Sequence, residues 1–337
     1  MTSVTKPKRD WKRILPGILI SALSLVILFY FIDIQRLIAV LQKADFLIIF
    51  LFVFSTLIWL LIRSKVWRTL LQEKATLSQV FFTLNEGYLL NNILPFRLGE
   101  VARAFLMSRK AGLKFFEVLS TIIVERSLDI TFAVGMLLIS LPFAIGASWA
   151  KQASFAASLM IVVVLAVLYV LARNQEWAIG MFERITRRWP SAQSKISPQL
   201  SAFFTGLAVF REGKRFLRTI LWMTLNWLLS IGQYYLLIRA FTPAVKLHWI
   251  PFTLGAVSLG AAAPSSPGAV GVLELSMVGA LAVFGLDGAI ALAAALTAHL
   301  FSYLITGVIG IFALARDGLT LSGLYKNLQN SSTDTSA

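Results

Sequence analysis

The chain is 337 residues long and 58% hydrophobic, with only 14% charged residues and a mean hydropathy of +0.78. Because soluble domains carry about 25% charged residues, this composition excludes a sizeable soluble domain and predicts an all-α, polytopic membrane helix bundle. The absence of Cys and the presence of only two His exclude a disulfide framework and predict neither a metal site nor a cofactor. The formal charge of +15 is attributed to cytoplasmic loops that face anionic lipid rather than to nucleic-acid binding.

The first half of the chain alternates apolar segments with basic clusters. Apolar segments are expected at 14–32, 46–62, 77–94 and 114–143, with a short helix over 99–107. The first segment is too long for a signal-peptide core, so we expect a retained helix. The basic residues from Arg63 to Lys74 are expected to mark the cytoplasmic end of the second segment.

The second half repeats this alternation after a connector. We expect an apolar segment at 155–171, a polar and basic cytoplasmic connector at 173–218, and apolar segments at 219–238, 249–263 and 289–315. The sequence thus predicts a single integral membrane domain over 1–326 and a disordered tail over 327–337.

A broken stretch, NNILPFRLGEVAR, follows the 77–94 segment. Pro95 removes a backbone donor and Gly99 weakens a helix, while Glu100 and Arg103 lie one helical turn apart. A broken helix with ionisable groups is tolerated at membrane depth where it is buried in protein or lines a wet cavity. This stretch, including Arg97, is therefore a candidate substrate site; an ordinary segment followed by a solvated loop is the alternative.

A charged stretch, VERSLD, lies inside the 114–143 segment. Glu125, Arg126 and Asp129 share one helical face, and Glu125 is expected about 16 Å deep at 1.5 Å per residue, near the middle of the hydrocarbon core. Charges at this depth need partners and face cavities, where Arg126 could bind a phosphate. A structural ion network is the alternative, and the two interpretations are compatible.

A second break, APSSPGAVG, precedes a short helix that carries Glu274. Its prolines interrupt the chain, and Gly268 and Gly271 allow close backbone approach. The N–H groups of the following helix form a natural anion site, to which Ser265 and Ser266 can add donors. A tight packing turn is the alternative, and Glu274 is expected to face inward.

Two polar stripes follow helical spacing in the second half. They consist of Asn226, Ser230 and Gln233, and of His299, Ser302, Tyr303 and Thr306. We expect interhelical hydrogen bonding from both. Cavity lining, and proton relay by His299, are the alternatives.

The distribution of the 31 Lys and Arg residues predicts the topology. It favours a re-entrant hairpin at 77–107 that opens to the cytoplasm and another at 249–284 that opens to the opposite side, with both termini cytoplasmic and Arg126 alone within the membrane. The halves 46–143 and 219–315 would then be inverted repeats with paired breaks, an architecture of transporters. Chance placement of Gly and Pro is the alternative.

Three motifs together resemble a known family: LGEVAR at 98–103, VERSLD at 124–129 and PSSPGAVGVLE at 264–274. The chain is similar over nearly its whole length to the flippase-like membrane family that includes the transmembrane region of lysylphosphatidylglycerol synthases. The resemblance implies lipid transfer between leaflets, although some members are described as glycosyltransferases. The soluble aminoacyl-transfer domain of the two-domain synthases has no counterpart here, which argues against lipid aminoacylation.

Two function classes are compatible with these observations. The first is a flippase or scramblase, not an enzyme, that moves an anionic phospholipid or a polyprenyl-phosphate-linked lipid in a prokaryotic inner membrane. The second is a membrane transferase that uses a lipid-linked donor. Intrinsic ATP drive is unsupported because no GxxxxGK[ST] motif is present, and homo-oligomerisation is left open. The expected substrate-binding residues are Arg97, Glu100, Arg103, Glu125, Arg126, Asp129, Ser265, Ser266, Gly268, Gly271 and Glu274.

Overall fold

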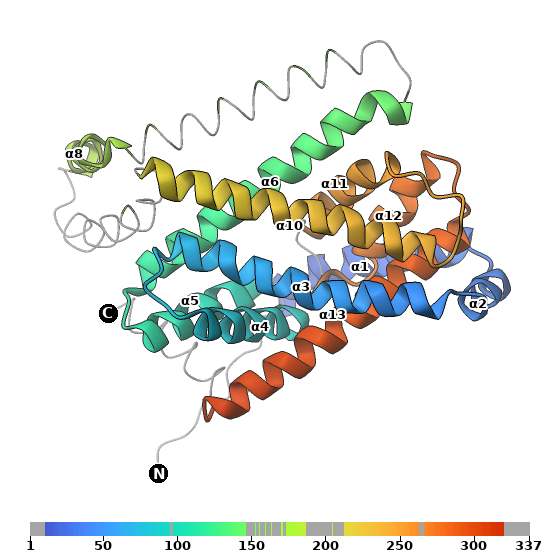
Figure 1. Ribbon diagram of the computed structural model, residues 1–337, viewed down its shortest axis with the longest axis horizontal. Coiled ribbons are helices and arrows are strands. Elements are labelled where there is room, and N and C mark those ends of the chain that lie inside the picture. Colours follow the sequence, from blue (N-terminus) through green and yellow to red (C-terminus); the bar gives the residue numbers. More distant parts are fainter. Residues whose placement is uncertain are drawn as a thin grey trace.

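The computed structural model describes residues 11–94, 97–145, 173–186, 212–262 and 266–319, with isolated positions between 146 and 211. Within these ranges the ordered elements are helices, without a strand (Figure 1). The helices are α1 (Trp11–Phe31), α2 (Ile34–Gln42), α3 (Phe46–Leu70), α4 (Leu77–Ile93), α5 (Leu98–Ala111), α6 (Phe115–Ile145), α8 (Gln175–Thr186), α10 (Gly213–Arg239), α11 (Trp249–Ala262), the 3-10 turn η3 (Pro267–Ala269), α12 (Val272–Ala282) and α13 (Gly288–Arg316).

Most expected segments correspond to helices, and two boundaries were wrong. Helix α3 continues to Leu70, so Arg63, Lys65 and Arg68 of the basic cluster lie within the helix, and Lys74 follows it. The connector contains helix α8, and its last residues form the start of α10. Pro95, the tail and most of the 155–171 segment lie outside the described residues.

Side chains at the helix ends determine where several helices begin and end. Asp45 and Asp287 accept hydrogen bonds from the first N–H groups of α3 and α13. Thr76 and Gln79 form a capping box at the start of α4. Gly112, with φ of 65°, ends α5 in the left-handed conformation that favours glycine.

Three of the helices that the structure describes are long and apolar enough to cross a membrane by length and composition. They are α3, α6 and α13. Large apolar side chains remain exposed along them, as expected for surfaces that contact lipid rather than water: Phe46, Phe50, Phe54 and Leu61 of α3, Ile130 and Ile139 of α6, and Leu300, Val308 and Phe312 of α13. The described chain is thus a membrane helix bundle.

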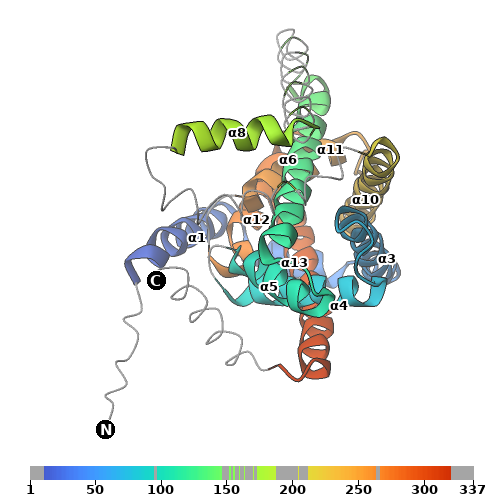
Figure 2. The ribbon, with the colours of Figure 1, turned by 90° about the vertical axis from the view of Figure 1, so that its left-hand side faces the viewer.

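The helices of the two halves pack in a reciprocal arrangement. Helices α3 and α10 lie side by side, as Figures 1 and 2 both show. Helix α4 of the first half packs on α13 of the second, and α11 of the second packs on α6 of the first. Within each half, the helices that flank a break also pack together, α4 with α5 and α11 with α12.

Polar contacts identify two ends of the bundle. At one end, the Asp45 N–H donates to the Ala240 carbonyl oxygen at 2.8 Å, which joins the start of α3 to the end of α10. At the other end, Arg218 pairs with Glu73 at 2.5 Å. Helices α3 and α10 are therefore antiparallel. Lys74 and Lys110 lie at the second end too, where they pair with Glu117 and Asp317 respectively.

Candidate functional site

Helix α5 starts at a residue with an unusual backbone conformation. Arg97 has φ of 54°, in the left-handed region that residues other than glycine seldom occupy. Its guanidinium donates a hydrogen bond to the carbonyl oxygen of Ala261, at the end of α11. This contact holds the first break directly against the second pair of helices.

Gly99 allows α5 to cross α4 at close range. A Cβ atom added at Gly99 would lie 2.2 Å from the carbonyl oxygen of Gly87, far inside van der Waals contact. One turn later, the Arg103 side chain packs against Gly87 of α4, and its guanidinium lies 4.1 Å from the centre of the Trp67 ring of α3. Its Nη2 atom donates to Glu125 of α6 at 2.6 Å.

Arg103 and Glu125 belong to a buried layer of charges that also includes Arg63 of α3. The Arg63 guanidinium donates two hydrogen bonds to the Asp129 carboxylate, at 2.8 and 2.5 Å, and also contacts Glu125. The side chains of Arg63, Arg103 and Glu125 are at most 3% exposed. Each of these charges therefore has a partner of opposite sign, which buried ions need.

A second layer of charges is more open. Arg126 lies 3.3 Å from Glu100 and 3.4 Å from Asp129, and 28% of its side chain is exposed. Arg97 lies 3.7 Å from Glu100 and is 40% exposed. We call both layers together the arginine–carboxylate network: Arg63, Arg97, Arg103 and Arg126 with Glu100, Glu125 and Asp129. Its four arginines exceed its three carboxylates, so the network has one uncompensated positive charge.

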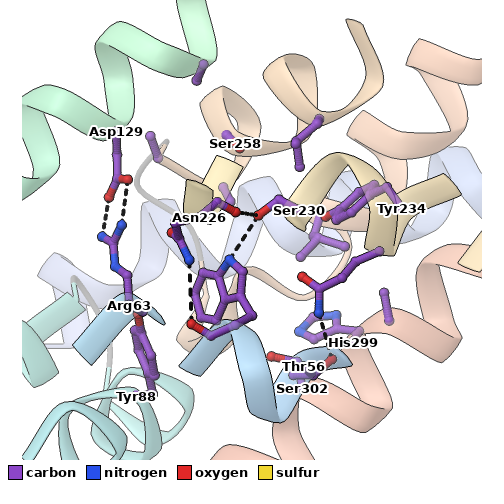
Figure 3. A pocket seen from close by; sticks show the side chains of 18 of the residues that line it. Thr56, Arg63, Tyr88, Asp129, Asn226, Ser230, Tyr234, Ser258, His299 and Ser302 are labelled. Carbon is purple, nitrogen blue, oxygen red and sulfur yellow. Dashed lines mark hydrogen bonds and ion pairs between the residues drawn. The ribbon is translucent and has the colours of Figure 1, made fainter. Parts of the chain in front are cut away.

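The open layer faces a cavity of about 550 Å³. Arg63, Arg97, Glu100, Arg126 and Asp129 form its charged wall. Aliphatic, aromatic and uncharged polar residues form the rest, and the aromatic and polar ones include Trp59, Tyr88, Asn226, Ser230, Gln233, Tyr234 and Ser302. Figure 3 shows the Arg63–Asp129 pair on one side of this space and Thr56, His299 and Ser302 on the other. A smaller cavity of about 340 Å³ shares Arg97, Glu100 and Arg126 with it.

The second break borders both cavities. Gly268 lines each of them, and Ser266 lines the smaller one. Gly268 has φ of 71°, and a Cβ atom there would overlap the Tyr303 hydroxyl, so only glycine fits. Gly271 instead packs against α1, where an added Cβ would lie 2.8 Å from the Ser21 carbonyl oxygen.

Glu274 lies behind this break and is buried. Its Oε2 atom accepts a hydrogen bond of 2.7 Å from the Gly271 N–H, and its Oε1 atom contacts Nδ1 of His299 on α13. The carboxylate thus both caps α12 and pairs with an imidazole.

The structure therefore separates the candidate residues by position. Arg97, Glu100, Arg126, Asp129, Ser266 and Gly268 line a cavity, Arg103 and Glu125 support that wall from behind, and Gly271 and Glu274 lie beyond the second break. Ser265 lies outside the described residues.

Sequence reasoning missed Arg63, and the prediction that Arg126 is the lone arginine at this depth was wrong. Arg63 is buried in the same network as Arg126 because α3 continues past it. Arg63 lies four residues after Trp59 on the same helical face, and this spacing is the feature of the sequence that could have identified it. Trp59 and Arg63 both line the larger cavity.

Comparisons with known proteins identify the family. Two UPF0104 membrane proteins of Methanothermobacter thermautotrophicus are similar to the chain: one is 22% identical over 87% of this chain and 91% of its own length, and the other 24% identical over 72% and 76%. No solved structure matches. The family described as the lysylphosphatidylglycerol synthase TM region matches residues 14–310, so the chain belongs to this family of membrane proteins.

Proposed function

We propose that this protein is a lipid flippase or scramblase, which moves an anionic phospholipid or a polyprenyl-phosphate-linked lipid between leaflets. The observation that carries the proposal is the open layer of the arginine–carboxylate network. Arg97 and Arg126 face a cavity of about 550 Å³ with part of their guanidinium surface exposed, whereas Arg63 and Arg103 are buried against carboxylates. The two open arginines are thus available to a ligand.

The charge and shape of this wall fit a lipid phosphate. The uncompensated positive charge of the network matches the single negative charge of a phosphodiester. A guanidinium presents donors in a planar fork that binds phosphate oxygens in pairs. The remaining wall, with Trp59, Tyr88 and Tyr234, offers aromatic surface and a few polar groups for the rest of the head group.

Transport explains the cavity better than group transfer does. A membrane transferase needs a carboxylate or another base that is free to accept a proton within reach of the substrate. Among the described carboxylates that line the cavity, Glu100 and Asp129 both lie against arginines. We therefore assign substrate binding to these residues and no catalytic role.

The reciprocal packing supports an inverted-repeat transporter. In such proteins, equivalent broken helices of two halves meet at the substrate site. Here α4 packs on α13 while α11 packs on α6, and Arg97 of the first break bonds to Ala261 beside the second. We infer that the pairs α4–α5 and α11–α12 are re-entrant hairpins that enter an inner membrane from opposite sides.

Reconstitution into vesicles tests the proposal. Purified protein would be placed in liposomes with a panel of fluorescent lipids that includes phosphatidylglycerol, a polyprenyl phosphate and zwitterionic phosphatidylcholine. A membrane-impermeant quencher reports leaflet transfer, and chromatography reports chemical change. We expect transfer of an anionic lipid without chemical change. A new lipid product, or no transfer of any anionic lipid, would contradict the proposal.

A further inference from the structure

His299 lies on the far side of the cavity from the Arg63–Asp129 pair (Figure 3), and its ring forms a buried pair with the Glu274 carboxylate. His299 comes from α13 and Glu274 from α12, and their side chains are 9% and 4% exposed. The pair is separate from the arginine–carboxylate network, and phosphate binding leaves its chemistry unused.

The hydrogen-bond geometry requires the pair to hold one shared proton. His299 Nε2 lies 3.0 Å from the carbonyl oxygen of Gly268, which can only accept, so Nε2 carries a hydrogen. Nδ1 faces Oε1 of Glu274, and two acceptors cannot bond to each other. The proton between them lies either on Nδ1, as imidazolium and carboxylate, or on Oε1, as imidazole and carboxylic acid. Both arrangements have zero net charge.

The shared proton ties the second break to α13. His299 holds the break through the Gly268 carbonyl oxygen, and Glu274 holds it through the Gly271 N–H. If the proton leaves, a buried carboxylate faces the lone pair of a neutral imidazole, and the contact becomes repulsive. Because Gly268 lines both cavities, the state of the pair acts directly on the wall of the proposed lipid site.

The groups around the pair explain how a bound lipid would affect it. Tyr303 packs edge-on against the His299 ring, with centroids 4.4 Å apart, and its buried hydroxyl has no hydrogen-bond partner among the described residues. The other titratable groups that face the cavity are Arg63 of α3, Tyr88 of α4, Arg97 before α5, Glu100 of α5, Arg126 and Asp129 of α6, and Tyr234 of α10. A lipid anion held by this wall and a proton held by the pair have opposite charges and attract each other across the cavity.

We propose that the His299–Glu274 pair is a proton-coupling site, at which one proton is carried with each anionic lipid. The proposal rests on the proposed function as a lipid transporter. The proton enters from water in the cavity, is shared by Nδ1 and Oε1 while the lipid is bound, and returns to water on the other side once the lipid has left. The lipid therefore accumulates in the leaflet on the alkaline side of a proton gradient.

The steady-state leaflet distribution tests this coupling. Proteoliposomes carry the labelled anionic lipid that the wild type transfers fastest, with and without a pH difference of about one unit. One proton per lipid gives up to about tenfold accumulation on the alkaline side, since one pH unit corresponds to about 1.4 kcal/mol. Without the gradient the distribution is even.

Glu274→Gln is the informative variant. Its amide oxygen can still accept from the Gly271 N–H, and its amide N–H can donate to Nδ1, so the hydrogen bonds remain while the shared proton is lost. We expect even distribution with or without the gradient. His248→Gln, a change to the other, exposed histidine, should keep the accumulation. As a second measurement, a pH dye inside wild-type vesicles should report proton movement when the lipid is added.

The outcomes separate the two proposals. The coupling is overturned if wild-type protein transfers the lipid but its leaflet distribution stays even under the gradient, or if accumulation persists in Glu274→Gln. Either result leaves the flippase proposal intact. Absence of transfer by the wild type in every condition overturns both.

Discussion

Arg126 is the residue best placed to meet a phosphate. Its contacts with Glu100, Asp129 and Glu125 are 3.3 to 3.6 Å long, whereas the Arg103–Glu125 contact is 2.6 Å. Longer contacts and partial exposure mean that a ligand can compete for this guanidinium with little loss of existing hydrogen bonds. Arg103 is fixed by its own partner and supports the wall instead.

Arg126→Lys should separate binding from folding. Lysine keeps the charge but loses the planar fork, so we expect transfer to fall about tenfold, equivalent to one lost charge-assisted hydrogen bond, with near-native thermal stability. Arg126→Ala should abolish transfer. The measurements are leaflet transfer in vesicles and the unfolding temperature in detergent. Normal transfer by a stable Arg126→Ala protein would rule out phosphate binding at this arginine.

Arg103→Met should act on stability. Removing this arginine leaves Glu125, which is 0% exposed, with fewer positive partners, and breaking a buried pair costs about 3–5 kcal/mol. Arg109→Met on the same helix is the matched control, because Arg109 is exposed. Unfolding by denaturant or heat should show a large loss of stability for Arg103→Met and little change for Arg109→Met. Equal stability of the two would mean that the buried layer contributes little to the fold.

At the scale of elements, hydropathy and helix breakers predicted most helices and both breaks, but not the partners across helices. Because Arg63, Lys65 and Arg68 are clustered, the apolar segment that became α3 was expected to end before Arg63. In the structure Arg63 is buried against Asp129, and Arg68 donates to the Ala75 carbonyl oxygen. The Arg63–Asp129 pair joins residues 66 positions apart, and no local pattern identifies such a partner, which is why the charged wall was only partly predicted.

The crossing of α4 and α5 gives an element-scale prediction. Gly99→Ala would place a methyl group 2.2 Å from the Gly87 carbonyl oxygen, so the helices must move apart, at a cost of about 1–3 kcal/mol. We expect a lower unfolding temperature and reduced lipid transfer. Gly232→Ala in α10 meets no atom within 4 Å and should be neutral or stabilising. Similar behaviour of both variants would argue against a tight crossing as a requirement of the site.

At the scale of the whole molecule, contacts between distant segments agree with the orientation expected from charge. Three ion pairs join segments expected on the cytoplasmic side: Glu73–Arg218, Lys74–Glu117 and Lys110–Asp317. Arg36 with Asp287 joins two segments at the opposite end, where Asp45 also bonds to Ala240. Among the described residues, Lys74, Lys110 and Arg218 therefore lie at one end of the bundle, the end that the positive-inside rule predicts to be cytoplasmic.

Cysteine labelling tests this orientation, and the chain suits it because it contains no native cysteine. Glu176→Cys in α8 and Lys246→Cys in the loop after α10 both change exposed residues. Helix α8 belongs to the connector expected in the cytoplasm, so a membrane-impermeant maleimide should leave Glu176→Cys unlabelled in intact cells and label it after permeabilisation. Lys246→Cys should react in both conditions, because α10 carries the chain to the other end of the bundle. The opposite pattern would invert the topology, and labelling of both in intact cells would place α8 outside and remove the inverted relation between the two halves.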